Sequence, residues 1–283
     1  MLFSVIVPVY NRERLVVHAI ESILQQDYQY FEIVVIDDGS QDNTRNVLNE
    51  FSKKDNRIQC IFQRNKGASA ARNAGVSAAK GDVIVYLDSD DTVKPTFLSA
   101  IKISLETASE KTFGIVNQVR HVVLVDKELN ILDQLEPEVL CERPPTLQEY
   151  YHWKVKTTSS GLFHLREVFL KKGHWNEDLR YIEDWDFLMQ LGNLDPKGFT
   201  FVMDPLVFYT QRYGTEEGMC SRAKYADWAK AFDEIYHRHK DDKLMNGQEW
   251  WPNRVEKYKK LQKLVEQGKE KPAMYKYFPD YQL

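Results

Sequence analysis

Residues 3–26 read FSVIVPVYNRERLVVHAIESILQQ and contain two patterns in succession. The first, Phe3–Val9, is a short apolar run rich in β-branched residues, which predicts a buried strand. The second, Arg14–Gln26, has apolar residues at spacings of three and four on one face, which predicts an amphipathic helix. The apolar residues of that face are Leu15, Ala19, Ile20, Ile23 and Leu24. The stretch therefore predicts a strand followed by a helix.

This strand–helix pattern occurs three more times. The predicted pairs are Glu32–Ile36 with Asn43–Phe51, Ile58–Phe62 with Ala68–Ala79, and Asp82–Leu87 with Thr96–Leu105. Four successive units predict an α/β fold with a mostly parallel central sheet that is flanked by helices on both faces. Ligands of such sheets bind beyond the carboxyl ends of the strands, and three of these ends are polar. They are Tyr10-Asn11, Asp37-Asp38-Gly39-Ser40 and Asp88-Ser89-Asp90-Asp91.

The regular alternation ends near residue 112. A capping box at Thr146 predicts a short helix, and another helix is expected to begin near Glu183. From Tyr225 the pattern is helical and charged, with Trp250-Trp251-Pro252 interrupting two helices. Strands are predicted at 115–125, 129–132, 161–165 and 205–209. We therefore predict one domain over residues 1–222, with halves of about 1–112 and 113–222, and a helical C-terminal appendage over 223–283.

Composition narrows the class of function. The 283 residues carry a formal net charge of -4 with both signs spread along the chain, which disfavours nucleic-acid binding. The three cysteines lie far apart without metal-ligand spacing, so a disulfide framework and a zinc site are both disfavoured. The first apolar run is too short for a signal peptide, and no stretch approaches the ~20 apolar residues of a membrane span. These features predict a cytoplasmic protein.

The motif Asp88-Ser89-Asp90 follows the fourth predicted strand. Alternate side chains of a strand share a face, so the two carboxylates can point toward one place. Oxygen ligands of this kind suit Mg²⁺ or Mn²⁺, with water and substrate phosphates completing the shell. An acidic loop in solvent is the alternative for a bare tripeptide, and the neighbouring polar strand ends favour the cation site.

Three other residues near the same rim have two interpretations each. Asp38 can accept the imino hydrogen of a uracil or cap the following helix. Tyr10 can stack on a nucleobase or be an ordinary half-buried aromatic at a strand end. Arg72 can donate to a phosphate or base, or form a salt bridge to the acidic rim.

Taken together and in order, these motifs resemble glycosyltransferase family 2. The resemblance covers roughly residues 3 to 215, and the order of several motifs is more specific than any one of them. The matching segments are Val5–Asn11, Ile36–Asp42, Gly67–Asn73, Leu87–Asp91, Ser159–Phe163 and Glu183–Asp186.

The resemblance implies a Rossmann-like nucleotide-diphospho-sugar transferase fold, with a nucleotide-binding half in residues 1–112 and an acceptor half in 113–222. It also implies inverting transfer of a sugar with a divalent metal, Mn²⁺ or Mg²⁺, held by Asp90 with Asp88. The expected nucleotide-sugar contacts are Pro8, Tyr10, Asn11, Asp38, Arg72, Asp88, Ser89 and Arg212. The expected residues of the acceptor or donor-sugar pocket are Glu183, Trp185, Ser160 and Gly161.

Asp184 is the candidate catalytic base, because inversion in one displacement needs a base on the acceptor face. A helix N-terminus favours its ionised form, whereas Glu183 and Asp186 oppose ionisation. The alternative is that all three are helix N-terminal acids without a chemical role. Trp185 can wall a sugar or belong to the core.

One segment departs from the family. Relatives commonly have a histidine after the late strand, in a pattern resembling Tyr-Arg-x-His, where this chain has Tyr209-Thr210-Gln211-Arg212. Arg212 cannot ligate a cation, but it can neutralise part of the diphosphate charge. We therefore predict a more weakly held metal with Arg212 assisting the leaving group. The stretch 213–218 that follows is either a lid or a passive surface loop.

The sequence thus predicts a transferase that moves a sugar, with UDP as the first choice of nucleotide, to the hydroxyl of a carbohydrate or glycolipid in polysaccharide or glycoconjugate synthesis. A catalytically silent nucleotide-sugar binding protein and a nucleotidyltransferase are the alternatives. The aromatic and basic C-terminal region can dock on the inner face of the membrane or pack on the domain. An oligomer is left open, and no nucleic-acid partner is expected.

Overall fold

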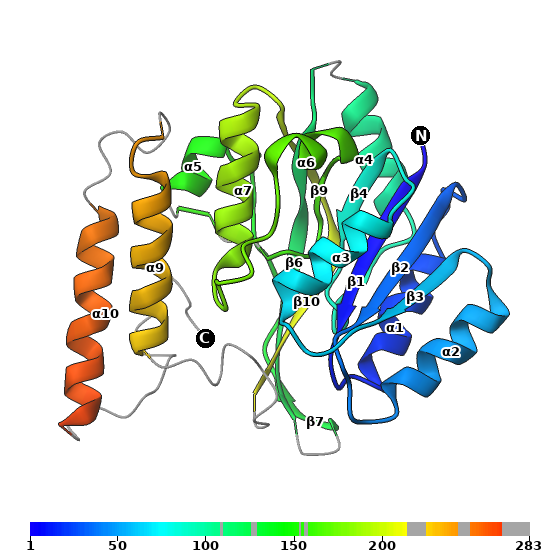
Figure 1. The fold of residues 1–283 in the computed structure, drawn as a ribbon, viewed down its shortest axis with the longest axis horizontal. Coiled ribbons are helices and arrows are strands. Elements are labelled where there is room, and N and C mark those ends of the chain that lie inside the picture. Colours follow the sequence, from blue (N-terminus) through cyan, green and yellow to red (C-terminus); the bar gives the residue numbers. More distant parts are fainter. Residues whose placement is uncertain are drawn as a thin grey trace. The chain divides into compact units, whose positions relative to one another are not determined.

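The first four strands form the parallel part of one sheet (Figure 1). In the computed structural model they are β1 (Phe3–Val9), β2 (Phe31–Asp37), β3 (Ile58–Phe62) and β4 (Val83–Tyr86). They lie in the order β3-β2-β1-β4, and each neighbouring pair is parallel. All four predicted strands are therefore confirmed, and their carboxyl ends meet at one edge of the sheet.

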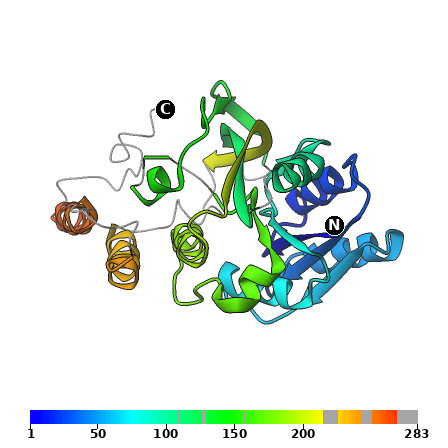
Figure 2. The ribbon, with the colours of Figure 1, turned by 90° about the horizontal axis from the view of Figure 1, so that it is seen from above.

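The helices between these strands cover both faces, as expected for βα units (Figure 2). They are α1 (Leu15–Leu24), α2 (Thr44–Lys54), α3 (Ala68–Ala78) and α4 (Phe97–Glu106). Helices α1 and α4 lie on one face of the sheet, and α3 lies on the other.

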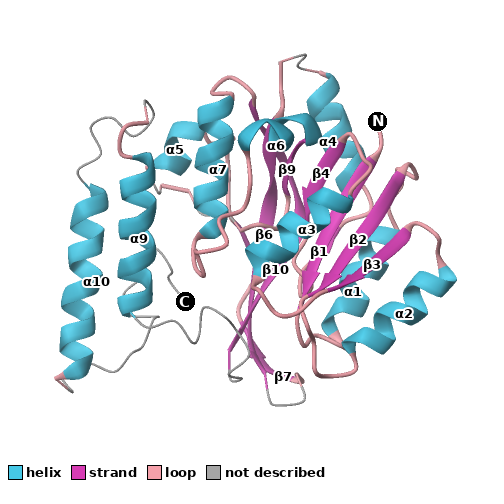
Figure 3. Cartoon of the chain, in the orientation of Figure 1, coloured by secondary structure: helices cyan, strands magenta, loops and turns pink. Residues whose placement is uncertain are grey.

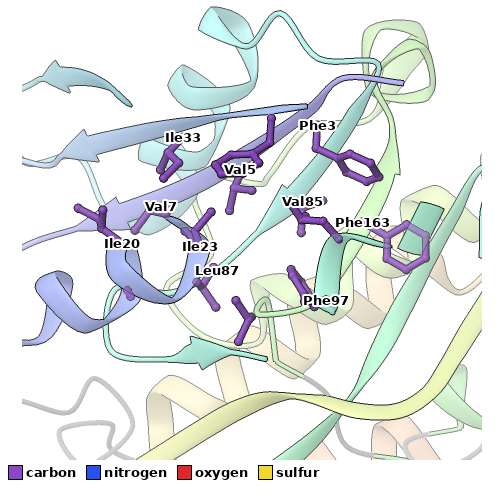
Figure 4. Close-up of a cluster of buried hydrophobic side chains, with 14 of the residues drawn as sticks. Phe3, Val5, Val7, Ile20, Ile23, Ile33, Val85, Leu87, Phe97 and Phe163 are labelled. Carbon is purple, nitrogen blue, oxygen red and sulfur yellow. The ribbon is translucent and has the colours of Figure 1, made fainter. Parts of the chain in front are cut away.

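Strand alternation decides which side chains each helix covers. Val5 and Val7 of β1 pack with Ile20 of α1 and Phe97 of α4 in the main apolar cluster (Figure 4). Because successive side chains of a strand point to opposite faces, Ile6 points the other way, toward α3.

The close approach of α3 to the sheet needs a glycine. A Cβ at Gly75 would come within 2.5 Å of the Ile6 Cγ2 atom and 2.6 Å of the Ile36 Cδ1 atom. Helix α3 therefore lies directly on β1 and β2, which fixes the height of its other residues above the sheet.

The remaining strands pair differently. Strand β9 (Leu162–Leu165) is antiparallel to β4 and to β6 (Phe113–Val125), and β10 (Phe199–Tyr213) is antiparallel to β5 (Thr92–Val93). The expected mostly parallel sheet is thus parallel over β3-β2-β1-β4 and antiparallel in these other pairs. Parallel neighbours need a crossover connection, and the regular strand–helix alternation that supplies it stops after β4.

Two short strands pair with β6, and helices also follow it in the chain (Figure 3). The strands β7 (Ile131–Gln134) and β8 (Glu138–Val139) are both antiparallel to β6. The helices are α5 (Leu147–Tyr151), α6 (Arg166–Lys172) and α7 (Glu183–Leu194).

Helix α5 begins as the sequence predicts. The Glu149 backbone N–H donates to Thr146 Oγ1 at 3.2 Å, and the Thr146 N–H donates to Glu149 Oε2 at 2.8 Å. These reciprocal bonds form the capping box and confirm the expected helix start.

Helix α7 begins at a strained residue. Ile182 precedes it with φ of 54°, in the left-handed region. A side chain branched at Cβ is rare there, and the conformation costs about 1–2 kcal/mol. The strain lies next to Glu183 and Asp184, the acidic pair that the sequence singles out.

The described residues are 1–107, 110–125, 129–152, 154–155, 158–213, 225–242 and 250–267. They divide into two compact units, one formed by Met1–Arg120 with Glu138–Thr210 and the other by His121–Pro137 with Gln211–Leu283. The domain boundary that we predict at residue 222 lies outside the described residues and stays a prediction.

The second unit contains α9 (Tyr225–His239) and α10 (Trp250–Glu266), which run side by side (Figure 3). The Phe232 and Tyr258 rings stack between them at 5.5 Å. The expected interruption at Trp250-Trp251-Pro252 is corrected: these residues begin α10, because a proline fits the first turn of a helix, where its missing N–H has no intrahelical acceptor. In the part of the chain that is described, no helix has the length and apolar character needed to cross a membrane.

Candidate active site

The Asp88-Ser89-Asp90 motif forms a turn directly after β4. The Asp91 backbone N–H donates to the Asp88 carbonyl at 3.1 Å. Ser89 and Asp91 are buried, whereas the alternate residues Asp88 and Asp90 are partly accessible. The two carboxylates that the sequence pairs are thus the two that remain partly open to a ligand.

Arg72 of α3 joins this turn to a distant acid. Its Nη2 atom donates to Asp88 Oδ1 and to Ser159 Oγ, both at 2.8 Å, and its Nη1 atom donates to Glu183 Oε1 at 3.1 Å. The side chain is 3% exposed. Burial lowers the pKa of Arg72, but the charges of Asp88 and Glu183 together raise it by more. The net pKa is raised, so the guanidinium stays ionised. The salt bridge to the acidic rim therefore forms, and the contact of Arg72 with a phosphate or base, which is compatible with this bridge, stays a prediction.

Two serines before β9 hold the same turn. Ser159 Oγ donates to Asp88 Oδ2 at 2.6 Å. Ser160 Oγ accepts from the Asp88 backbone N–H at 3.0 Å and donates to Asp91 Oδ2. The Asp88 carboxylate is therefore held through both oxygens, and the backbone of its turn is held as well.

Gly161 continues this segment in a conformation that suits glycine. Its φ is +82°, and its N–H donates to the Tyr86 carbonyl at 2.9 Å. A Cβ at this position would lie 2.8 Å from the Val207 Cγ2 atom. Gly161 thus brings Ser159 and Ser160 up to the end of β4.

Glu183 and Asp184 begin α7. Burial raises the pKa of Glu183, and the Arg72 charge opposes this rise. Burial and the neighbouring Glu183 charge raise the pKa of Asp184 to about 8, while Arg72 lowers it. Of the two acids, Asp184 is partly exposed and Glu183 is buried. Asp184 is the member of the pair that can both reach a ligand and bind a proton near neutral pH.

Asp91 is a third perturbed acid, on the inner side of the turn. Burial and the charges of Asp90 and Asp88 raise the pKa of the Asp91 carboxyl well above its usual value. The Ser160 hydroxyl and, at 3.3 Å, the Thr210 backbone N–H both donate to it. Asp91 thus links the turn to β10 from the interior.

The ends of β1 and β2 form a second polar group at the same edge. The Asn11 N–H donates to Ser40 Oγ at 2.9 Å, and the Gln41 N–H donates to Asn11 Oδ1 at 2.8 Å. Tyr10 beside them is 42% exposed. Pro8 is buried within β1, opposite Ile36.

Asp38 is engaged by the loop that follows β3. Its Oδ1 accepts from Gln63 Nε2 at 2.7 Å and from the Lys66 N–H at 2.9 Å, and its Oδ2 accepts from the Gly67 N–H at 2.8 Å. The neighbouring Asp37 accepts from the Ser40 N–H at 2.8 Å. Asp38 therefore fixes the backbone directly before α3.

The structure thus brings Arg72, Asp88, Ser160 and Glu183 into one network, with Asp184 beside it. The Trp185 side chain is 3% exposed, and its ring centroid lies 6.2 Å from that of Tyr150. This burial favours the interpretation of Trp185 as a core residue. The Arg212 side chain and residues 214–218, expected to be either a lid or a passive surface loop, lie outside what the structure describes. Among the described residues, no group of three His, Cys, Asp or Glu forms a metal cage.

The sequence pattern of Glycosyl transferase family 2 matches residues 4–161, more than half of the chain. The chain belongs to glycosyltransferase family 2. The family match ends just after Ser159 and Ser160, so it includes the Asp88 turn and Arg72 but not Glu183 and Asp184.

A relative supports the same assignment over a longer range. This family 2 glycosyltransferase is 30% identical over 257 residues to "Glycosyltransferase GlyG" of Streptococcus pneumoniae, and the match covers 87% of this chain and 82% of GlyG. The chain spans about half the length of two further glycosyltransferases that it matches, from Bacillus subtilis and Nostoc.

Two solved structures share the fold. S. aureus TarS, determined with UDP-GlcNAc, has a TM-score of 0.66 and 21% identity, with 91% of this chain and 71% of that one covered. Mannosyltransferase PcManGT from Pyrobaculum calidifontis, determined with GDP-Man and Mn²⁺, has a TM-score of 0.59 and 16% identity, with 98% and 81% covered. The expected nucleotide-sugar transferase fold of this family 2 member is thereby confirmed.

Three residues of the candidate site are absent from the residues chosen by sequence. Ser159 and Asp91 stand directly beside chosen residues, and the motifs Ser159–Phe163 and Leu87–Asp91 contain them. Trp175 lies under the Arg72 guanidinium, 4.4 Å from Cζ to the ring centroid. It belongs to no motif, so only the folded chain reveals its place.

Proposed function

We propose that this protein is an inverting glycosyltransferase that moves a sugar from a nucleotide diphosphate, with UDP as the first choice, to an acceptor hydroxyl. The observation that carries the proposal is the Arg72 bridge, which joins Asp88 on the nucleotide-binding side to Glu183, the neighbour of Asp184. A single displacement needs a charged site for the leaving diphosphate and a base on the other face of the sugar. TarS with UDP-GlcNAc and PcManGT with GDP-Man support a nucleotide-sugar donor.

Asp184 is the proposed base. Its pKa of about 8 lies close to the pH at which cytoplasmic enzymes operate, where a general base is most effective. In the proposed reaction Asp184 accepts the proton of the acceptor hydroxyl as that oxygen attacks the anomeric carbon. The diphosphate departs on the opposite face, so the anomeric configuration inverts.

Asp88 and Asp90 fit the divalent cation that the family resemblance implies. Mg²⁺ and Mn²⁺ are usually held by one or two carboxylates while water and substrate phosphates complete the shell, so a full protein cage is not required. Both residues are partly accessible, and Asp88 is already oriented by Arg72 and Ser159. A bound cation would supply charge neutralisation for the leaving diphosphate.

The nucleobase is proposed to lie at the ends of β1 and β2. Tyr10 offers an exposed ring for stacking, and Asn11 is fixed beside it by Ser40 and Gln41. Asp38 contributes by holding the loop at Lys66 and Gly67, and its oxygens keep further acceptor capacity for an imino hydrogen.

The proposed acceptor is a hydroxyl of a carbohydrate or glycolipid. The proposed reaction belongs to polysaccharide or glycoconjugate synthesis at the cytoplasmic side of the membrane. Peripheral membrane association and oligomerisation belong to the same proposal. The sugar itself is set by loops that line the pocket, which differ among enzymes of one fold.

The proposal is tested by thermal shift with UDP-GlcNAc, UDP-glucose, UDP-galactose and GDP-mannose, each with and without Mn²⁺. A donor that binds the native state increases the free energy of unfolding, by about 2.7 kcal/mol at a hundredfold excess over Kd, and so raises the unfolding temperature. We expect a UDP-sugar to give the largest shift and Mn²⁺ to increase it.

The product then tests the mechanism. We expect the anomeric configuration of the transferred sugar, measured by NMR, to be opposite to that of the donor. Asp184→Asn is expected to bind donor and to lose transfer, whereas Asp178→Asn, an exposed acid before the same helix, keeps it. A product with the donor configuration would exclude inversion. Binding without hydrolysis or transfer, unchanged by Asp184→Asn, would identify a silent binding protein.

A further inference from the structure

Trp175 lies in the segment between α6 and α7 and is fully buried. Its indole ring faces the Arg72 guanidinium, whose Cζ atom is 4.4 Å from the ring centroid. A desolvated guanidinium is attracted to the electron-rich face of an indole. Trp175 therefore contacts the residue on which the Asp88–Glu183 bridge depends.

The backbone of Trp175 is fixed to the same helix as Arg72. Asn73, the next residue of α3, donates from Nδ2 to the Trp175 carbonyl at 2.9 Å and accepts at Oδ1 from the Trp175 N–H at 2.9 Å. Its Nδ2 also donates to Glu177 Oε1 at 2.9 Å. The Asn73 side-chain amide thus binds both polar groups of the Trp175 backbone. The positions of the indole and the guanidinium are therefore set by adjacent residues of one helix.

Other aromatic side chains fix the tilt of the indole. Phe187 of α7 stacks on Trp175 with centroids 4.4 Å apart and planes 20° apart. Tyr86, the last residue of β4, meets it edge-on at 4.9 Å and 80°. Phe187 follows Glu183 by one helical turn, and Tyr86 is two residues before Asp88. The indole therefore contacts the strand that ends two residues before Asp88 and the helix that begins with Glu183.

The guanidinium needs this support because its hydrogen bonds leave one direction unrestrained. Asp88, Ser159 and Glu183 engage the Nη atoms, whereas Arg72 Nε has no hydrogen-bond partner among the described residues. The bonds that exist all lie at the far end of the side chain. Without a flat surface against it, the guanidinium can tilt and lengthen these bonds, and a displacement of ~1 Å at a reacting site can cost about a hundredfold in rate.

We propose that Trp175 is a positioning residue for sugar transfer: its indole holds Arg72 in the plane that links Asp88 to Glu183 and Asp184. The proposal rests on the proposed function, because it assigns Trp175 a part in the same reaction. Trp175 acts through Arg72 and touches neither donor nor acceptor.

The first arm of the test compares Trp175→Leu, Trp175→Phe and Trp175→Tyr. Release of UDP from UDP-GlcNAc, UDP-glucose and UDP-galactose, and of GDP from GDP-mannose, is followed with Mn²⁺ present, below the unfolding temperature of every variant. We expect Trp175→Leu to lower kcat by roughly 10- to 100-fold with a change in donor KM of less than about threefold, because the donor contacts remain while the charges shift. Trp175→Phe and Trp175→Tyr restore most of kcat, since a smaller aromatic face still supports the guanidinium.

The second arm is a double-mutant cycle with Arg72→Lys. A lysine cannot form the forked bonds, so removing the indole in that background is expected to lower kcat by less than about threefold further. Phe97→Leu is the matched control: it deletes a buried ring of the main core on α4, which lies on the face of the sheet opposite α3. We expect it to lower the unfolding temperature while leaving kcat within about twofold.

Several results would overturn the proposal. Independent, multiplicative losses for Trp175→Leu and Arg72→Lys would show that Trp175 does not act through Arg72. Equal losses in Trp175→Phe and Trp175→Leu, or an equal kcat loss in Phe97→Leu, would leave only a packing role. A wild-type protein that turns over none of the four donors would overturn the proposed function, and the role of Trp175 with it.

Discussion

Asp184 is the proposed base, and its raised pKa means that its ionisation in the folded chain lowers stability. A carboxyl that is ionised in the unfolded chain above a pKa of about 3.9 keeps its proton to about pH 8 in the folded chain. Burial and the Glu183 charge cause this rise, and the strained Ile182 conformation lies directly before the pair. Perturbed carboxyls and strained backbone often occur together at functional sites.

The raised pKa of Asp184 predicts the pH dependence of the reaction. In the proposed reaction Asp184 acts in its base form, so kcat/KM is expected to rise by roughly tenfold per pH unit below the folded pKa and to level off near pH 8. A pH series of initial rates under subsaturating donor measures this limb. A rate that is flat between pH 6 and pH 8 would contradict the assignment of Asp184 as the base.

The same shift predicts that removing the charge stabilises the protein. Because the folded pKa lies above the unfolded one, the folded state binds more protons between about pH 4 and pH 8, and stability falls as the pH rises through that range. Asp184→Asn avoids this loss. We expect it to unfold about 2–4 °C higher than wild type at pH 8, roughly 1 kcal/mol, and to match wild type near pH 4. Asp178→Asn, an exposed acid, should show no such difference between the two pH values.

The contacts of the site depend on partners that lie far apart in sequence. Arg72 and Glu183 are 111 residues apart, and Arg72 and Ser159 are 87 apart. Local patterns identify residue types that suit a site, so Asp88, Arg72 and Glu183 could be chosen, but not the bonds between them. No sequence pattern singles out Trp175, because a buried tryptophan in a connecting segment resembles any core residue until its neighbour across the fold is known.

For helices and strands, the sequence predicts best those elements whose own residues show a clear hydrophobic period. The four strand–helix units were predicted within a few residues, since each has a clear period and polar ends. The pairing of β9, β6 and β10 was not, because strand direction is decided by contacts between distant segments. The strand predicted at 205–209 is β10 (Phe199–Tyr213), whose flanking polar residues conceal its length.

Helix α3 packs on the sheet through Gly75 and carries Arg72 of the candidate site. Gly75→Val would place atoms where Ile6 and Ile36 already lie, so α3 must move away from the sheet. We expect a loss of about 1–3 kcal/mol in the free energy of unfolding, measured by urea denaturation. Because Arg72 lies one turn earlier on the same helix, kcat for UDP release should fall as well.

Ser77→Val is the matched control for this helix. Ser77 is exposed on α3, so the substitution alters helix propensity by less than about 0.7 kcal/mol and leaves the packing on the sheet intact. If Gly75→Val lowers stability but leaves kcat at the wild-type value, the position of α3 is not coupled to the reaction.

At the scale of the whole molecule, the core that supports the site lies within one stretch of the chain. The main apolar cluster runs from Phe3 to Val207 in sequence, and the Arg72 network uses residues between 72 and 183. Residues 121–137 nevertheless group with the C-terminal unit. The predicted domain of residues 1–222 folds alone only if its own core is stable enough without the contacts that group residues 121–137 with the C-terminal helices.

We expect a chain ending at residue 222 to fold and to bind donor, because all of the cluster and all of the proposed nucleotide contacts are retained. Circular dichroism should show one cooperative thermal transition, and the UDP-sugar that stabilises the full chain should raise the unfolding temperature of the truncated chain by a similar amount. A truncated chain that is folded but shows no donor-dependent shift would place part of the donor site beyond residue 222. One that unfolds without cooperativity would show that residues 121–137 need the C-terminal helices, and that the boundary at residue 222 does not separate two domains.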